Sequence, residues 1–251
     1  MSGFLDIQGL NKRFDGVNAL DGFSCAIETG EIVGLVGPNG AGKTTLFNVI
    51  TGFLKADDGS ALFHGANLLS LPPHRVPAVG IFRTFQDLRL IRRLSVLENV
   101  CLAFKKQPGE NLGSVFFRHK HCSLHEDVNR DRAISLLRSA GLEAKVNDPA
   151  DDLSYGQQKL LSLVCCLAAD ADLLLLDEPV AGIAPEMIER ILGIIQRLPE
   201  KGKSVILIEH NMDAVVQVCN RVVFMDAGVK ICDGSPDEVR NDPRVIEAYL
   251  D

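Results

Sequence analysis

The sequence lacks any apolar run long enough to cross a bilayer. A membrane-spanning helix needs about 20 mostly apolar residues in succession, whereas the best candidate, residues 160–169, is far shorter and stops at Asp170. The first residues also lack the basic segment and apolar run of a secretion signal. We therefore expect a cytoplasmic protein, in which any membrane role would depend on a partner.

Clustered positive charge and paired cysteines are lacking as well. The net charge is −7 and no basic stripe is visible, so we expect no nucleic acid partner, because affinity for phosphate backbones comes mainly from clustered cations. The seven cysteines include no CxxC pair, which fits free thiols in a reducing compartment better than a disulfide framework.

The apolar pattern predicts an α/β fold. Residues 31–36 form a near-continuous apolar strand pattern. Residues 173–176 and 205–208 form unbroken apolar runs, which are typical of strands buried on both faces of a parallel sheet. Residues 46–53 have apolar side chains at i, i+3, i+4 and i+7, which predicts a helix, and a second helix is expected over 185–199. The alternation of strand, helix and strand predicts a mainly parallel, doubly wound sheet.

Other segments depart from this alternation. Residues 4–28 have short alternating apolar runs and Asp-Gly turns, which predict an antiparallel β flank. Residues 95–104 and 127–140 have helical patterns separated by a polar stretch, so we expect an inserted helical subdomain. Residues 221–232 suggest a hairpin that turns at Ala227-Gly228.

A glycine-rich loop follows the first buried strand. Residues 37–44 match G-x4-G-K-[ST] between a strand and a helix, where backbone N–H groups and the helix dipole cradle phosphate. Lys43 should reach the β- and γ-phosphates of ATP, and the Thr44 hydroxyl should ligate Mg²⁺. An ordinary glycine turn is the alternative, but it has no need of Lys-Thr. The expected ATP contacts are Gly37, Pro38, Asn39, Gly40, Ala41, Gly42, Lys43, Thr44 and Thr45.

Two acidic residues end the second buried strand. Asp177 and Glu178 follow Leu173-Leu-Leu-Leu, at the carboxyl edge where open α/β sheets place their ligands. Asp177 is expected to hold Mg²⁺ directly or through water, and Glu178 to polarise the water that attacks the γ-phosphate. A helix-capping Asp-Glu pair is the alternative. Together the two motifs predict a P-loop NTPase core.

A third motif resembles the signature of the ABC transporter ATPases. Residues 153–157 read Leu-Ser-Tyr-Gly-Gln, and the Ser and Gln also have the spacing of a helix capping box. The resemblance implies an ABC nucleotide-binding domain whose signature contacts the γ-phosphate of ATP held by an opposite subunit. The signature residues with this implied role are Ser154, Tyr155, Gly156 and Gln157.

The resemblance implies roles for three more residues. Gln86, in Arg83-Thr-Phe-Gln86, resembles the Q-loop glutamine that contacts Mg²⁺ and the attacking water, and His210 resembles the switch histidine that touches the γ-phosphate. Phe14 occupies the position of the aromatic that stacks on adenine, with a core position in the β flank as the alternative. The expected catalytic residues are Lys43, Gln86, Glu178 and His210.

The resemblance covers essentially the whole chain and implies its organisation. The 251 residues would form one ABC ATP-binding domain, with a nucleotide-binding core at 1–87 and 168–251 and a helical subdomain at 88–167. Residues 71–75, 80–86 and 234–250, together with the Tyr within residues 153–158, are similar to those of the ATPases for branched-chain, or hydrophobic, amino acid uptake. Urea and amide importers share that branch, and lipopolysaccharide exporters are near relatives.

Two departures from the family pattern stand out. The helix after the signature carries Cys165-Cys166 in a stretch where basic residues and an Ala-Arg pair are common, and Ala184 replaces the usual Asn of the D-loop. The first departure would alter an internal charge contact, and the second would weaken communication between subunits. Neither removes a residue that is expected to touch phosphate.

The resemblance also implies partners, which would hold the chain peripherally on the inner face of the cell membrane. These are a second ATP-binding cassette, identical or paralogous, transmembrane permease subunits, and a periplasmic or extracellular solute-binding protein that acts indirectly if the transporter is an importer. The alternatives from other classes are a soluble ABC ATPase, a P-loop kinase and a regulatory ATP-binding module. The chain lacks the long coiled-coil insertion or paired cassettes of the soluble ATPases, and a kinase leaves the signature unexplained.

Overall fold

The structure is a computed structural model that describes residues 4–84, 88–105 and 119–248. Its contacts divide the chain into two compact units. Unit 1 consists of Met1–Arg83, Asp172–Ala181 and Leu192–Asp251. Unit 2 consists of Thr84–Ala171 and Gly182–Ile191.

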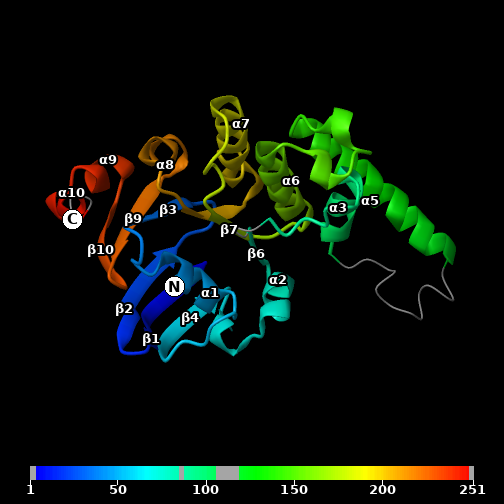
Figure 1. Ribbon diagram of the computed structural model, residues 1–251. Coiled ribbons are helices and arrows are strands. Elements are labelled where there is room, and N and C mark those ends of the chain that lie inside the picture. Colours follow the sequence, from blue (N-terminus) through cyan, green and yellow to red (C-terminus); the bar gives the residue numbers. More distant parts are fainter. Residues whose placement is uncertain (1–3, 85–87, 106–118, 249–251) are drawn as a thin grey trace. The chain divides into compact units, whose positions relative to one another are not determined.

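A six-stranded sheet forms the centre of unit 1 (Figure 1), in the order β10-β9-β3-β8-β7-β6. Its strands are β3 (Ile32–Val36), β6 (Ile81–Arg83), β7 (Leu173–Asp177), β8 (Ser204–Ile208), β9 (Arg221–Asp226) and β10 (Val229–Gly234). All neighbours pair in parallel except β9 and β10, which form the predicted hairpin. Every residue of β3, β7 and β8 is buried, so the three predicted interior strands are confirmed.

An antiparallel sheet of four strands completes the β structure described for unit 1. Its strands are β1 (Leu5–Phe14), β2 (Val17–Ile27), β4 (Asp58–Phe63) and β5 (Ala66–Asn67), in the order β2-β1-β4-β5. The antiparallel β flank predicted over residues 4–28 is confirmed. The pairing of β1 with β4 was not predicted, because it joins segments that are far apart in the sequence.

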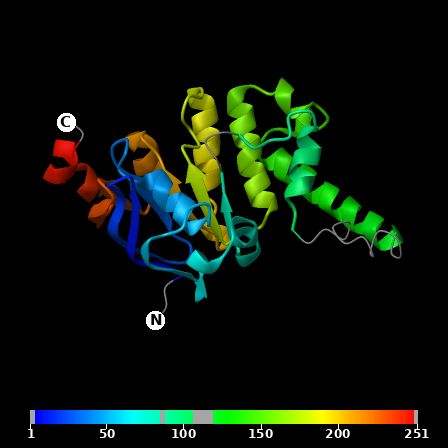
Figure 2. The ribbon, with the colours of Figure 1, turned by 60° about the horizontal axis from the view of Figure 1, so that its bottom comes forward.

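The helix α1 (Lys43–Ile50) packs into the core that the two sheets share. One apolar cluster joins Leu10 of β1, Phe47 of α1 and Leu35 of β3, and Figure 2 shows α1 beside the blue strands of the antiparallel sheet. The prediction that this helix extends to Phe53 was wrong. The helix ends at Ile50 because Gly52 adopts a φ of 76°, which turns the chain away and leaves Phe53 46% exposed.

Short helices complete unit 1. They are α2 (Val76–Val79), α8 (Met212–Val218), α9 (Pro236–Arg240) and α10 (Pro243–Ala248), while α7 (Pro185–Ile195) is divided between the two units. The capping box at the start of α9 pairs Ser235 with Glu238, which stabilises the first turn by satisfying two backbone N–H groups.

Within the described part of unit 2, three helices pack together. They are α3 (Val96–Ala103), α5 (His119–Ser139) and α6 (Tyr155–Ala168). Both predicted helical segments are confirmed, although α5 begins at His119, earlier than its apolar pattern indicated. The mainly parallel sheet, the antiparallel flank and these helices confirm the predicted fold class. Across the described ranges, no helix combines the length and the apolar character that a bilayer crossing demands.

We predict that Phe63→Ala destabilises the protein by about 3–5 kcal/mol, because it removes a buried ring from the core. The Phe63 side chain is fully buried and meets the Phe4 ring edge-on, with ring centroids 4.9 Å apart. Denaturant unfolding of the full chain measures the change. Phe53→Ala, which removes a half-exposed ring, is the matched control and should cost less than half as much. Equal losses would contradict the packing described here.

Candidate nucleotide site

The glycine-rich loop lies between β3 and α1, and its path requires glycine at two positions. Gly37 has a φ of 151° and Gly42 a φ of 100°, values that L side chains rarely adopt. A Cβ atom at Gly37 would collide with the carbonyl oxygen of Met225, and one at Gly42 with that of Ala19. Close contact with β9 and β2 therefore fixes the loop at the start of α1.

Lys43 points back into this loop. Its Nζ donates to the carbonyl oxygens of Gly37 at 2.7 Å and Pro38 at 2.8 Å, and the residue is 6% exposed. Burial lowers the pKa of the Lys43 ammonium, while the nearby carboxylates of Glu178 and Asp177 oppose this shift. The ammonium group thus lies where a phosphate oxygen could replace the two carbonyl groups.

The first turn of α1 is suited to an anion. It contains the exposed Thr44 and the partly buried Thr45, and it has neither an acidic residue nor a side-chain cap. The positive end of the helix dipole and the first N–H groups are therefore not neutralised by side chains of this turn. A phosphate group that is held by the loop would receive both contributions.

Asp177 is the last residue of β7 and forms a buried ion pair that the sequence did not predict. The Nη2 atom of Arg83 donates to Asp177 Oδ2 at 2.9 Å, and the side chains of Arg83 and Asp177 are 6% and 4% exposed. The Nη1 atom of Arg83 also donates to Asn48 Oδ1 at 2.7 Å. Arg83 ends β6, and only the order of strands in the sheet shows that β6 is the neighbour of β7.

Glu178 and His210 follow adjacent strands and meet. The Nε2 atom of His210 lies 3.1 Å from Glu178 Oε1, and the backbone N–H of Glu178 donates to Ile208 at 2.9 Å. Glu178 has a φ of 49°, a left-handed conformation that costs about 1–3 kcal/mol in a residue other than glycine. The structure therefore brings together Lys43, Asp177, Glu178 and His210 at one edge of the parallel sheet.

The signature residues begin α6 in unit 2. Ser154 is the N-cap, and its Oγ accepts from the Gln157 N–H at 3.4 Å while Gln157 Oε1 accepts from the Ser154 N–H at 2.9 Å. The predicted capping box is thus confirmed. The Tyr155 ring is half exposed, with the Lys159 ammonium 5.3 Å from its centroid. A Cβ atom at Gly156 would lie 3.0 Å from the Met187 side chain.

Two further predicted residues have different outcomes. The Phe14 side chain is 42% exposed at the end of β1, with the Lys12 ammonium 5.3 Å from its ring, so the alternative of a core position is wrong. The exposed ring remains accessible for stacking.

Gln86 lies outside the residues that the structure describes, and its proposed contact with Mg²⁺ stays a prediction.

The adjacent cysteines of α6 serve packing. The Cys165 Sγ donates to the carbonyl oxygen of Asn99 in α3 at 3.5 Å, and Cys166 is 1% exposed. Burial raises the pKa of the Cys165 thiol to about 12, so the thiol stays protonated at neutral pH. This stretch of α6 therefore contributes uncharged contacts inside unit 2.

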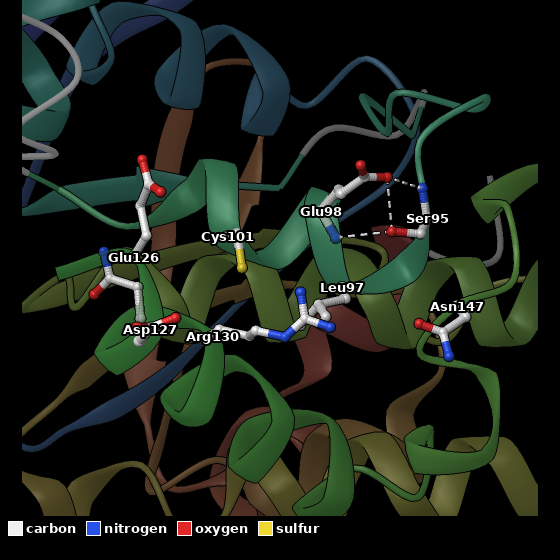
Figure 3. Close-up of a pocket in the computed structure, with 9 residues that line it drawn as sticks. Ser95, Leu97, Glu98, Cys101, Glu126, Asp127, Arg130 and Asn147 are labelled. Atoms are coloured by element: carbon white, nitrogen blue, oxygen red, sulfur yellow. Dashed lines mark hydrogen bonds between the residues drawn. The ribbon is translucent and has the colours of Figure 1, made fainter. Parts of the chain in front are cut away.

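A groove of about 530 Å³ opens in unit 2 beside α3 and α5 (Figure 3). Its walls carry the carboxylates of Glu98, Glu126 and Asp127 and the guanidinium of Arg130. An excess of carboxylates repels a triphosphate, and none of the lining residues belongs to the predicted ATP contacts. The groove is therefore not the ATP site.

Comparison with known proteins places these features in a family. The family model described as ABC transporter matches residues 20–181, and a second model, described as branched-chain amino acid ATP-binding cassette transporter, matches residues 229–250. The chain belongs to the ABC transporter family. It is an ATP-binding subunit of this family, whose members hydrolyse ATP in support of transport.

Individual relatives share almost the full length of the chain. The Escherichia coli high-affinity branched-chain amino acid transport ATP-binding protein LivG is 36% identical over 98% of this chain and 97% of its own length. The Pseudomonas aeruginosa counterpart BraF is 34% identical with the same coverage. A nucleotide-free ATP-binding cassette from an ABC transporter is 33% identical, with a TM-score of 0.84 over 99% of both chains. The ADP conformation of the cassette MJ1267 is 31% identical, with a TM-score of 0.83 over 100% of this chain and 99% of that one.

We predict that Arg83→Met lowers the free energy of unfolding by about 3–5 kcal/mol, because it leaves the buried Asp177 carboxylate without its guanidinium partner. Urea unfolding without nucleotide and Mg²⁺ measures this change. Arg138→Met is the matched control, since it breaks an Arg-carboxylate pair of 2.6 Å with Glu143 that is exposed to solvent. The control should unfold almost like the wild type. Equal stability of the two variants would contradict the importance of the buried pair.

Proposed function

We propose that this chain binds ATP and Mg²⁺ through residues 37–45 and Asp177, and hydrolyses ATP with Glu178 and His210 to drive branched-chain amino acid import. The observation that carries the proposal is the meeting of Lys43, Asp177, Glu178 and His210 at one edge of the parallel sheet. In this proposal residues 1–87 and 168–251 form the nucleotide-binding core, and residues 88–167 form the helical subdomain.

The proposed metal site has a suitable donor set. The Thr44 hydroxyl and the Asp177 carboxylate offer hard oxygen ligands, which Mg²⁺ prefers, and Gln86 is the third proposed ligand. When bound, Mg²⁺ would neutralise charge on the β- and γ-phosphates. The Arg83 guanidinium already holds one oxygen of the Asp177 carboxylate, which orients the group before any ligand arrives.

The proposed reaction transfers the γ-phosphoryl group of ATP to water, giving ADP and phosphate. Glu178 would hold and polarise the attacking water, and the adjacent His210 would contact the γ-phosphate. Lys43 would exchange the carbonyl oxygens of Gly37 and Pro38 for phosphate oxygens. The lysine ammonium then stabilises the negative charge that develops on the γ-phosphate.

The proposed site is completed by a second cassette. Ser154, Tyr155, Gly156 and Gln157 would contact the γ-phosphate bound by that partner, identical or paralogous, so that ATP holds the dimer closed and hydrolysis opens it. Transmembrane permease subunits would convert this movement into transport and hold the chain on the cytoplasmic face of the membrane. A periplasmic or extracellular solute-binding protein would act indirectly.

Several relatives support amino acids as the transported solute. The bacterial proteins LivG and BraF and an Archaeoglobus fulgidus relative that is 35% identical all carry names for branched-chain amino acid transport. The match of residues 229–250 to the branched-chain cassette model supports the same assignment.

We predict that Glu178→Gln binds ATP and forms a stable dimer in the presence of ATP and Mg²⁺. The amide cannot polarise the attacking water, so ATP is not hydrolysed and the closed dimer does not open. Size-exclusion chromatography with and without ATP and Mg²⁺ measures the shift. Lys43→Ala, which removes the phosphate contact, is the control and should remain monomeric. A monomeric Glu178→Gln protein with bound ATP would contradict a homodimeric site and favour a paralogous partner.

Uptake by whole cells tests the proposed solute. In cells that carry Glu178→Gln in place of the wild-type gene, accumulation of radiolabelled leucine should fall to the level of a deletion strain, since transport requires hydrolysis. Urea uptake is the control and should not change. Unchanged leucine uptake in both strains, when no second system for leucine operates, would count against branched-chain amino acid import.

A further inference from the structure

We infer that Glu209 is a positioning residue for ATP hydrolysis, which holds the segments after β7 and β8 in one geometry. The inference rests on the catalytic roles proposed above for Glu178 and His210. Glu209 directly follows β8 and is 2% exposed. Glutamate is seldom buried to this extent without partners, so its contacts indicate its role.

The carboxylate of Glu209 bridges two backbone segments. Its Oε1 accepts the N–H of Val180 at 3.0 Å, and its Oε2 accepts the N–H of His210 at 3.2 Å. Val180 lies two residues after Glu178 on the segment that leaves β7, whereas His210 is on the segment that leaves β8. One side chain therefore ties together the backbone next to both proposed catalytic residues.

Other contacts make the two segments dependent on each other. The backbone N–H of Glu178 donates to the carbonyl oxygen of Ile208 at 2.9 Å, and the backbone N–H of Ala181 donates to the carbonyl oxygen of Glu178 at 3.3 Å. Because the backbone of Glu178 is in a left-handed conformation, surrounding contacts must hold it there. The bond from Val180 to Glu209 supplies one such contact, directly beyond the strained residue.

The choice of a carboxylate is itself informative. A buried charge is costly unless it is hydrogen-bonded, and an apolar side chain would fill this space at a lower desolvation cost. An apolar side chain would, however, leave the N–H groups of Val180 and His210 without an acceptor. The benefit of Glu209 therefore lies in fixing both N–H groups, and with them the 3.1 Å contact between Glu178 and His210.

The test compares Glu209→Ala and Glu209→Gln with the wild type in steady-state ATP hydrolysis by the full chain. In Glu209→Ala, kcat should fall by about 10- to 100-fold, since small displacements of catalytic groups have effects of this order. The KM for ATP and the affinity for ADP should stay within about 2-fold. Glu209→Gln should retain an intermediate kcat, because its amide oxygen can replace one carboxylate oxygen while its NH2 group, which only donates, cannot accept the other N–H.

Ser204→Ala is the matched control for a loss of stability. Ser204 is a fully buried polar residue at the opposite end of β8. Its Oγ accepts the Gly30 N–H at 2.9 Å and donates to the backbone carbonyl oxygen of Glu28 at 3.3 Å. This variant should lower the melting temperature with little change in kcat. A Glu209 variant whose folded fraction turns over ATP like the wild type would overturn the inference.

Two further measurements keep the outcome decisive. If Glu209→Ala does not fold, amide hydrogen exchange of Glu209→Gln should still show faster exchange at Val180 or His210, and unchanged exchange at both would overturn the inference. Glu178→Gln is measured in parallel. If that variant hydrolyses ATP like the wild type, the proposed catalytic site is wrong; if it is inactive while both Glu209 variants are fully active, only the positioning role is wrong.

Discussion

The parallel pairing of β3, β8 and β7 is the constraint on which the site depends. Leu35 is in register with Ile208, and Ile208 with Asp177, so the three strands end at the same level. Parallel strands that end together release their following segments at one edge of the sheet. The glycine-rich loop, the acidic pair and His210 are therefore close because of backbone register.

Several unfavourable local features persist at this edge because the surrounding core supports them. They include the positive φ of Glu178, the buried ammonium of Lys43 and the buried carboxylates of Asp177 and Glu209. Each is compensated by hydrogen bonds or ion pairs within unit 1, and the buried strands supply the apolar contacts that the folding free energy requires. These contacts orient the groups before any ligand arrives, and in the proposed function such preorganisation would favour the transition state of hydrolysis.

Much of the fold was predictable from local patterns. Apolar runs predicted β3, β7 and β8, and capping-box spacing predicted the first turn of α6, because burial and capping depend on neighbouring residues in the sequence. The extent of α1 was predicted wrongly, since the apolar period continued to Phe53 while Gly52 ended the helix. The pairing of β1 with β4 was not predicted, because strand pairing between distant segments leaves no local signal.

The sequence by itself determined the motifs from which the chemistry is predicted. The glycine-rich loop before Lys43, the acidic pair at the end of a buried strand and the signature motif are contiguous patterns, each with a physical reason for its residue types and spacing. Only the tertiary structure decided the partners of those residues. Arg83 pairs with Asp177, and Glu209 accepts from Val180, because strand order brings together segments that are remote along the chain. Such pairs arise from packing in three dimensions, and a one-dimensional pattern carries no record of them.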